Sequence, residues 1–263
     1  MKIGIIGTGN MGQAIISRLK GCSLVIYDKD VLKAKKVSKK FGSAVHTCEN
    51  GKMGEADVII LCVKPQEINS ALVSLSKTGL KKKTVISIAA GIKTAALEKA
   101  LGTVPVIRAM PNTPALVGMG MTAICKGKYA GDADLKKAKN IFLKIGDCVM
   151  VEEKDMDAVT AVSGSGPAYV FLFAEELIKA AVKAGLPLKT GELLVKKTFA
   201  GAANMMCSGA RKLSELRANV TSRGGATEEA LKVFQNEKFG EIIKKAVRAA
   251  KIKSGKLAKT VNK

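Results

Sequence analysis

Several residue types that often carry chemistry are rare or missing in this chain. None of its 263 residues is tryptophan and 4% are aromatic, which predicts an aliphatic, alanine-rich core. The single histidine, His46, excludes a metal site built from several histidines and restricts any histidine-based triad to that residue. Because no motif surrounds His46, we expect it on the surface.

The six cysteines are scattered and include no C-x-x-C pair. This pattern favours reduced thiols in a cytoplasm over a disulfide framework or a zinc site. Apolar runs fall well short of the roughly 20 residues that a membrane-spanning helix needs. Met1 and Lys2 lead directly into a β-prone run, so we expect a cytoplasmic protein with no signal peptide and no membrane contact.

Acidic residues are scarce relative to basic ones. The chain has 44 lysines and arginines against 22 aspartates and glutamates, a formal net charge of +22. The excess is nearly all lysine, is spread over most predicted surface helices and is not interleaved with aromatic residues, which argues against a nucleic-acid partner. We interpret it as a solvated surface that raises the local concentration of anionic ligands, an effect that salt would screen.

The first twelve residues contain a strand, a glycine turn and a helix start. The apolar run 3–6 predicts a buried parallel strand, and the sequence Gly7-Thr8-Gly9-Asn10-Met11-Gly12 opens an apolar-periodic segment over 14–19. Gly7 permits a tight turn, Gly9 lets the backbone approach a pyrophosphate, and Gly12 lets the helix pack close to the strand. The helix N-terminus would supply N–H donors to the phosphates, so this order predicts a dinucleotide site.

Asp28 ends the second predicted strand, about 20 residues after the glycines, where an acidic residue can hold the adenosine ribose. A second interpretation is that Asp28 only caps the following helix. A carboxylate facing the ribose favours a free 2′-hydroxyl, but lysines at 29, 33, 35 and 36 would offset its repulsion of a 2′-phosphate. Both NADH and NADPH therefore remain candidates.

The chain changes character near residue 155. Up to that point short apolar runs alternate with helical patterns, which predicts a doubly wound, mostly parallel α/β sheet. Beyond it, alanine-rich helical patterns predict a second, all-helical domain, and the basic tail 253–263 is expected to fray. We place the boundary between domains of residues 1–155 and 156–263. The predicted strands are residues 3–6, 23–27, 58–63, 84–88, 105–110, 121–125 and 148–151; the later helices are 168–184, 190–208, 227–233 and 241–253.

Two glycine-containing segments in the second half invite a functional explanation. In residues 163–169, Ser-Gly-Ser-Gly-Pro-Ala-Tyr, either a helix begins at Pro167 or the glycines serve a close approach. In residues 221–229, hydroxyls and glycines precede a helix whose first turn carries Glu228 and Glu229. One interpretation is a capped helix start, and a compatible one is that the N–H groups of Gly225 and Ala226 also form a small anion-binding nest.

Together these motifs resemble the pyrroline-5-carboxylate reductase family. The matching residues occur in the family's order over nearly the whole chain. They are Gly7 to Gly12, Val63-Lys64-Pro65-Gln66, Ser87-Ile88-Ala89-Ala90-Gly91, residues 108–114 (Arg-Ala-Met-Pro-Asn-Thr-Pro), residues 163–169, residues 216–220 and residues 221–227.

The resemblance implies a Rossmann domain followed by a helical domain that dimerises, with dimers often assembled into rings. It implies reduction of 1-pyrroline-5-carboxylate to L-proline with NADPH or NADH. By the same analogy, the cofactor contacts are Gly7, Thr8, Gly9, Asn10, Met11, Gly12, Asp28, Val63, Lys64, Pro65, Ala89 and Asn219. The substrate contacts are Glu153, Gly225, Ala226 and Thr227, with Thr227 as the catalytic residue, and no metal is involved.

Alternatives remain at this level. Arg223 stands where the family commonly has proline, and it either pairs with an anion or faces solvent. A related two-domain imine reductase or β-hydroxyacid dehydrogenase is the nearest other enzyme, although residues 159–174 lack the lysine that the dehydrogenases typically use. A dinucleotide-binding regulatory protein is the non-enzymatic alternative.

Overall fold

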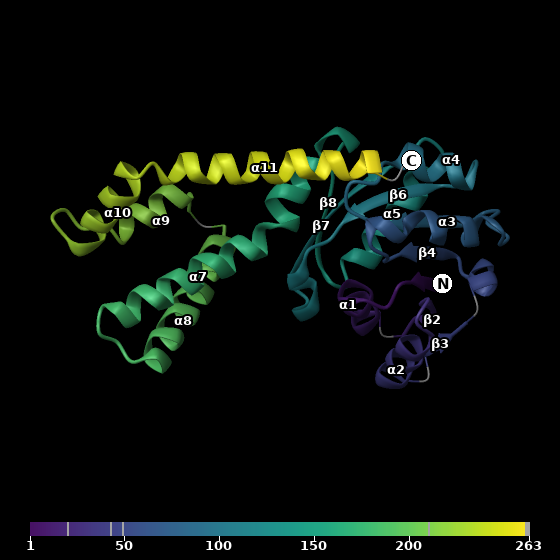
Figure 1. Ribbon diagram of the computed structural model, residues 1–263, viewed down its shortest axis with the longest axis horizontal. Helices are drawn as coiled ribbons and strands as arrows, with labels where there is room; N and C mark the ends of the chain where they lie inside the picture. Colours follow the sequence, from purple (N-terminus) through teal and green to yellow (C-terminus); the bar gives the residue numbers. More distant parts are fainter. Residues whose placement is uncertain (20, 43, 49, 210, 261–263) are drawn as a thin grey trace. The chain divides into compact units, whose positions relative to one another are not determined.

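The computed structural model describes residues 1–19, 21–42, 44–48, 50–209 and 211–260 (Figure 1). Among these residues eight strands form one sheet in the order β3-β2-β1-β4-β5-β6-β7-β8. All neighbours pair in parallel except β6 and β7, which are antiparallel. The strands are β1 (Lys2–Ile6), β2 (Ser23–Tyr27), β3 (Val45–Thr47), β4 (Val58–Leu61), β5 (Thr84–Ser87), β6 (Val106–Met110), β7 (Gly120–Lys126) and β8 (Gly146–Met150).

The chain divides into two compact units. The first consists of Met1–Pro167 together with the segment from Arg248 onward, and the second of Ala168–Val247. Helices of the first unit are α1 (Asn10–Arg18), α2 (Val31–Phe41), α3 (Ile68–Ser76), α4 (Thr94–Leu101), α5 (Asp132–Phe142) and α6 (Met156–Val159). The predicted domain boundary after residue 155 remains a prediction.

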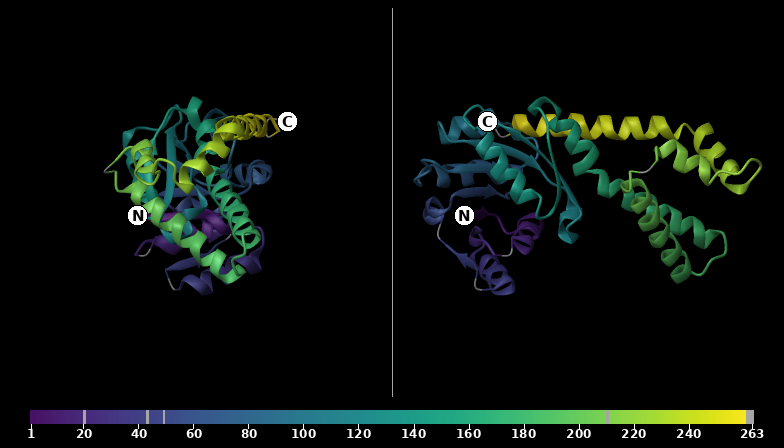
Figure 2. Two further views of the ribbon diagram at one scale, coloured as in Figure 1. Left: turned by 90° about the vertical axis from the view of Figure 1, so that its left-hand side faces the viewer. Right: turned by 180° about the vertical axis from the view of Figure 1, so that it is seen from behind.

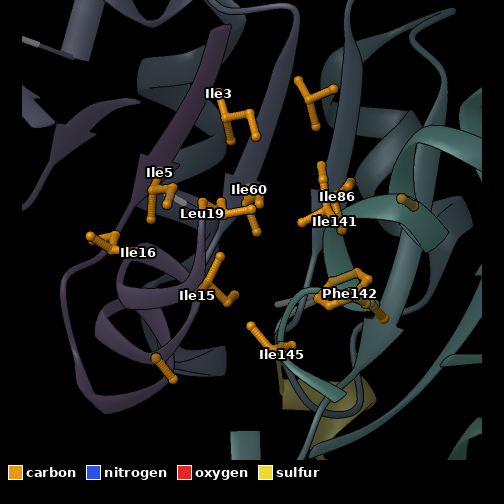
Figure 3. Packing of buried hydrophobic residues seen from close by; sticks show 14 of the residues in the cluster. Ile3, Ile5, Ile15, Ile16, Leu19, Ile60, Ile86, Ile141, Phe142 and Ile145 are labelled. Atoms are coloured by element: carbon orange, nitrogen blue, oxygen red, sulfur yellow. The ribbon is translucent and has the colours of Figure 1, made fainter. Parts of the chain in front are cut away.

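Alternate residues of each strand face opposite layers of helices, as the period of a strand requires. Ile3 and Ile5 pack with residues of α1 and α5, whereas Ile6 lies in the layer with α3 and α4. Figure 3 shows the first of these cores, including Ile60 and Phe142. Both faces of the sheet are therefore buried, which explains the continuously apolar strands and confirms the predicted doubly wound sheet (Figure 2).

The second unit is all-helical, as predicted. Helices α7 and α8 form an antiparallel hairpin, and the turn between them contains Gly185 at φ +98°. A Cβ placed on Gly191 of α8 would lie 3.3 Å from the Ala181 Cβ of α7, so a glycine permits their close approach. The later helices are α7 (Gly166–Lys183), α8 (Leu188–Cys207), α9 (Leu213–Asn219), α10 (Ala226–Asn236) and α11 (Phe239–Thr260), the last of which belongs to the first unit from Arg248 onward.

Three features differ from the sequence predictions. Helix α9 lies where no helix was predicted. His46 is exposed as expected, but it lies in β3, a strand of three residues that is too short to leave a periodic pattern. The basic tail does not fray at residue 253, because α11 continues to Thr260 and the Ser254 side chain is buried and bonded to Asp157. Residues 261–263 of the predicted tail lie outside the described residues.

None of the helices in the described part of the chain combines the length and the apolar character needed to cross a membrane.

Candidate functional site

The glycine turn between β1 and α1 has the local geometry that the motif predicts. Gly7 has φ +98°, its N–H donates to the Tyr27 carbonyl at 2.7 Å, and an added Cβ would lie 2.6 Å from the Cys62 carbonyl oxygen. A Cβ on Gly12 would overlap the Gly7 carbonyl. No heavy atom of the described residues lies within 4 Å of a Cβ added at Gly9, so the space beside Gly9 is open to a ligand.

The remaining members of the motif play unequal parts. Thr8 is fully buried, and Met11 is half-buried against the core beneath α1. Asn10 is exposed at the start of α1, after the N-cap residue Gly9, which has no side chain to cap the helix. The first N–H groups of α1 therefore have no side-chain partner from the cap, which is the arrangement that favours an anion at a helix N-terminus.

The Asp28 carboxylate lies at the end of β2 and bonds to the glycine turn. Its Oδ2 accepts hydrogen bonds from the N–H and the hydroxyl of Thr8, each at 2.7 Å, and its Oδ1 accepts one from the Asp30 N–H at 3.1 Å. Lys33 Nζ lies 3.5 Å from Oδ2. Asp30, not Asp28, caps α2 by accepting from the Lys33 N–H.

These bonds set the charge state of Asp28. Burial by itself would raise the pKa of this carboxyl, but the Thr8 and Asp30 hydrogen bonds and the Lys33 ammonium together hold it below its usual value of 3.8. Asp28 is therefore ionised at neutral pH, with much of its negative charge already compensated.

A pocket of about 610 Å³ opens beside the glycine turn. It lies along the carboxyl ends of β1, β2 and β4, where ligands bind in open α/β sheets. Five predicted cofactor residues line it: Gly7, Gly9, Asp28, Val63 and Lys64. The other lining residues are Ile6, Tyr27, Lys29, Lys33, Cys62, Glu67, Ser70, Ala71 and Ser74.

The pocket wall formed by α3 and the turn before it was missed by the sequence reasoning. Ser70 and Ala71 lie three and four residues after Glu67, and Ser74 lies four and three residues after them, so all four share one face of the helical segment. The same spacing in the sequence, immediately after the predicted Lys64-Pro65 turn, could have identified this wall.

Charged side chains surround the pocket. Lys29, Lys33 and Lys64 face two carboxylates, those of Asp28 and Glu67. Lys29 and Glu67 form an ion pair, and their hydrogen bond lowers the pKa of Glu67 and raises that of Lys29. The balance of charge is positive, which suits a phosphate-bearing ligand.

Cys62 also lines the pocket but is chemically quiet. Burial raises the pKa of its thiol to about 12, so the reactive thiolate is scarce at neutral pH.

The other predicted cofactor residues lie outside the lining of this pocket. Pro65 is the first residue of the short 3₁₀ helix Pro65–Glu67, and Ala89 is buried directly after β5. Asn219 belongs to the second unit, where it is exposed at the end of α9.

Glu153 is half-buried in the first unit and already has partners. Its Oε1 accepts the Thr94 N–H at 2.7 Å, its Oε2 accepts the Thr94 hydroxyl at 2.9 Å, and Arg108 Nη1 lies 3.6 Å from Oε1. Thr94 is the first residue of α4, so Glu153 caps this helix from 59 residues away.

The predicted substrate residues of the second unit lie at the start of α10. Gly225 is the N-cap residue, and Ala226 and Thr227 are exposed in the first turn, whose N–H groups have no intrahelical acceptors. The Gly225 N–H itself donates to the Ser222 carbonyl at 3.0 Å, and the Gly224 N–H donates to Glu228 Oε2 at 2.8 Å. The nest therefore has its open donors at Ala226 and Thr227, not at Gly225.

Comparison with known proteins places this geometry in context. A family model described as "Pyrroline-5-carboxylate reductase dimerisation" matches residues 153–257, and one described as "NADP oxidoreductase coenzyme F420-dependent" matches residues 2–91. A pyrroline-5-carboxylate reductase from Corynebacterium melassecola is 37% identical over 98% of each chain.

Two solved structures are similar over nearly their whole length. A pyrroline-5-carboxylate reductase from Coxiella burnetii has a TM-score of 0.89 and 35% identity, covering 97% of this chain and 98% of that one. The Plasmodium falciparum pyrroline carboxylate reductase, solved with NADP bound, has a TM-score of 0.86 and 33% identity over 98% of each chain.

Proposed function

The chain belongs to the pyrroline-5-carboxylate reductase family, and we propose on that premise how its own residues serve the reaction. The enzyme is an NAD(P)H-dependent oxidoreductase that reduces the C=N bond of 1-pyrroline-5-carboxylate to give L-proline, the last step of proline biosynthesis. The observation that carries this assignment is similarity over 98% of both chains, combined with a glycine turn that opens onto a positively charged pocket.

The cofactor fits the first unit. Gly9 leaves open space for the pyrophosphate, and the first N–H groups of α1 point their positive dipole end toward it. We assign the adenosine end to the pocket corner formed by Asp28, Lys29 and Lys33. Val63 and Lys64, which line the pocket, together with Pro65 and Ala89 would hold the rest of the cofactor. When bound, it supplies the hydride.

The geometry of Asp28 favours NADPH over NADH. Its Oδ2 already accepts two hydrogen bonds from Thr8, and Lys33 lies 3.5 Å away, so the carboxylate opposes a 2′-phosphate only weakly. Lys29 and Lys33 can pair with that phosphate. We expect Lys33→Ala to lower kcat/KM for NADPH about tenfold and to leave the NADH value nearly unchanged, since a charge-assisted hydrogen bond contributes about 1.5 kcal/mol.

At the substrate end, the start of α10 offers the required groups. The N–H groups of Ala226 and Thr227 would hold the substrate carboxylate at the positive end of the helix. Gly225 would contribute its extended N-cap backbone, which directs these groups outward. The Thr227 hydroxyl would hydrogen-bond the ring nitrogen and orient the C=N bond, so that positioning supplies much of the rate.

A dedicated strong acid is not required. A protonated imine already carries its proton on nitrogen, and addition of a hydride to the neighbouring carbon yields the amine directly. Glu153 remains a prediction as a substrate contact. Because both of its oxygens accept hydrogen bonds from Thr94, a substrate contact would have to share them. Asn219 remains a predicted contact of the nicotinamide half.

The chain forms a homo-oligomer through its helical region, which matches the dimerisation model of the family. We propose that its dimers assemble further into a ring. We also propose a cytoplasmic location, since Cys62 and Cys125 are free thiols, which suits a reducing compartment.

The test is the decay of nicotinamide absorbance with 1-pyrroline-5-carboxylate, run in parallel with NADPH and NADH. Rapid oxidation supports the proposal, and the ratio of the two kcat/KM values measures the preference. Thr227→Val should lower kcat at least tenfold without changing NADPH affinity, whereas Thr190→Val, at an exposed position on α8, should leave both unchanged. The assignment would be contradicted by a folded protein that binds NADPH but fails to oxidise it when any cyclic imine is supplied.

A further inference from the structure

The segment Arg-Ala-Met-Pro-Asn at residues 108–112 has no part in the function described so far. It includes the end of β6, and its alternate residues Arg108, Met110 and Asn112 lie along one side of an extended chain. All three contact the segment 153–164, which follows β8. All three alternate side chains on this side of the strand therefore contact the same segment of the first unit.

Arg108 is the charged member of this row. Its side chain is 4% exposed, with Nη1 3.6 Å from Glu153 Oε1 and Nη2 3.5 Å from Asp157 Oδ1. Asp157 Oδ1 also accepts the Ser254 hydroxyl of α11 at 2.8 Å. Through Glu153, Arg108 is connected to the first residue of α4, Thr94, at the end of the loop that carries Ala89. Removal of such a buried cation would leave two carboxylates uncompensated.

Asn112 is the N-cap residue of the 3₁₀ helix Thr113–Val117, a place where asparagine usually caps with its side chain, but it makes no such bond. Its Oδ1 instead accepts the Met121 N–H at 2.8 Å. Its Nδ2 donates to the carbonyl and to the hydroxyl oxygen of Ser163, both at 3.3 Å. The amide therefore holds Ser163 from 51 residues away.

The segment that Asn112 holds has irregular backbone. Residues Thr160–Gly164 form a π-helical turn, in which the Ser165 N–H donates to the Thr160 carbonyl at 2.9 Å. A Cβ placed at Gly164 would overlap Met110 Cε, the end of a flexible side chain, so the turn packs directly against the Met110 side chain of β6. Single π-helical turns occur often at functional sites.

We propose that Arg108 and Asn112 are positioning residues for imine reduction. They hold the turn Thr160–Gly164 and the loop before α4 in register with the carboxyl end of β6, the edge of the sheet where ligands bind. The proposal rests on the reductase activity proposed above. It assigns the residue 108–112 motif to alignment of the reacting groups, a step that affects turnover more than cofactor binding.

The test uses the full-length enzyme with Asn112→Ala, Asn112→Asp and the control Asn140→Ala, at an exposed position on α5. For each, kcat, KM for 1-pyrroline-5-carboxylate, the Kd of NADPH by fluorescence and the oligomer mass by light scattering are measured. Asn112→Ala should lower kcat at least tenfold, with the Kd of NADPH within twofold and the mass unchanged. Asn112→Asp should lower kcat at least as much, because it replaces the Nδ2 donor with an oxygen that cannot donate to the Ser163 carbonyl.

Arg108 provides an independent arm. Arg108→Met should lower kcat in the same way, and Arg108→Lys should recover part of the loss because it restores a cation between Glu153 and Asp157. Ser163→Ala removes only the hydroxyl contact and should cost about two- to fivefold in kcat, a readout that remains if Asn112→Ala fails to fold.

Either of two results would overturn the proposal. One is a folded Asn112→Ala enzyme with kcat within twofold of the unmodified protein. The other is a loss of NADPH affinity as large as the loss of kcat, which would show a general structural role. If the reductase assignment itself were wrong, the unmodified enzyme and Asn140→Ala would also fail to turn over, so the two failures are distinguishable.

Discussion

The two units of the chain bury their apolar side chains to very different degrees. In the first, both faces of the sheet are covered, and residues such as Ile3, Ile60 and Phe142 are fully buried. In the second, Gly191 and Val195 are the buried residues among those that the structure describes. Large apolar side chains such as Phe171 and Leu193 remain about 60% exposed there, at 61% and 59%.

The difference in burial indicates that the first unit can bury its core within one chain. A sheet covered on both faces removes its apolar surface from water within one chain. The helical unit leaves many large apolar side chains exposed, and exposed apolar side chains in such number are typical of a protein–protein interface. The comparison therefore agrees with the match of this region to a dimerisation model.

The largest expected effect comes from a charge placed on the exposed apolar surface of the second unit. Phe171→Asp should weaken self-association by at least a hundredfold, because burying an unpaired carboxylate in an apolar interface costs several kcal/mol. Light scattering over a dilution series measures it. Lys189→Asp, in the exposed first turn of α8, adds a carboxylate where the helix dipole favours one and should leave the mass unchanged. An unaltered oligomer mass in Phe171→Asp would show that the exposed apolar surface around Phe171 does not mediate self-association.

The same substitution, leucine to alanine, should have different effects in the two units. Leu24→Ala, at a side chain 1% exposed in β2, should lower the free energy of unfolding by about 2–5 kcal/mol at every protein concentration. Leu193→Ala should act mainly through association, so its effect should grow on dilution. Denaturant unfolding at two concentrations separates them. Equal concentration dependence in both variants would contradict the distinction.

Within the first unit, the glycine turn should be intolerant of a side chain. Gly7→Ala meets φ +98° and a Cβ position 2.6 Å from the Cys62 carbonyl oxygen. We expect NADPH affinity to fall by about thirtyfold, equivalent to roughly 2 kcal/mol of backbone strain. Gly21→Ala, also at positive φ (+81°) but with open space around it, controls for the conformational cost alone. Fluorescence titration with NADPH gives both affinities, and equal losses would show that the clash at Gly7 is unimportant.

The smallest expected effect concerns pH. Because the folded protein holds the pKa of Asp28 below 3.8, this carboxyl stabilises the fold above that pH, and the contribution is lost as the pH falls through the lower folded value. Asp28→Asn should therefore be less stable at pH 7 and show a shallower decline in acid than the unmodified protein. Unfolding free energies measured between pH 7 and acid test this. Asp155→Asn, at an exposed position, should keep the original slope.

Much of the fold could be predicted from local patterns. Seven strands and helices α7, α8 and α10 were predicted close to their observed bounds, since continuous apolar runs and 3.6-residue periodicity indicate burial, whereas α9 was not predicted. Strand β3 was missed because three residues show no period. The extension of α11 was missed because the side chain that fixes it, Ser254, gains its partner Asp157 from a segment 97 residues away.

The candidate site divides in the same way. The glycine turn and the Lys64-Pro65 turn were identifiable because backbone conformation at strand ends demands particular residues. The wall formed by Ser70 and Ser74 had a detectable spacing that was not used. The partners of Glu153 could not be predicted, because Thr94 and Arg108 are distant in sequence and come close only through the packing of α4 and β6.

The sequence by itself determined the glycine turn, the alternation of strands and helices, the helical second half and the family, because each depends on residue types at short spacings. Only the tertiary structure decided that the Asp28 carboxylate bonds to Thr8 and that Arg108 lies between two carboxylates. Those contacts depend on which side chains packing brings together from positions 20 or more residues apart, and no local pattern encodes that proximity.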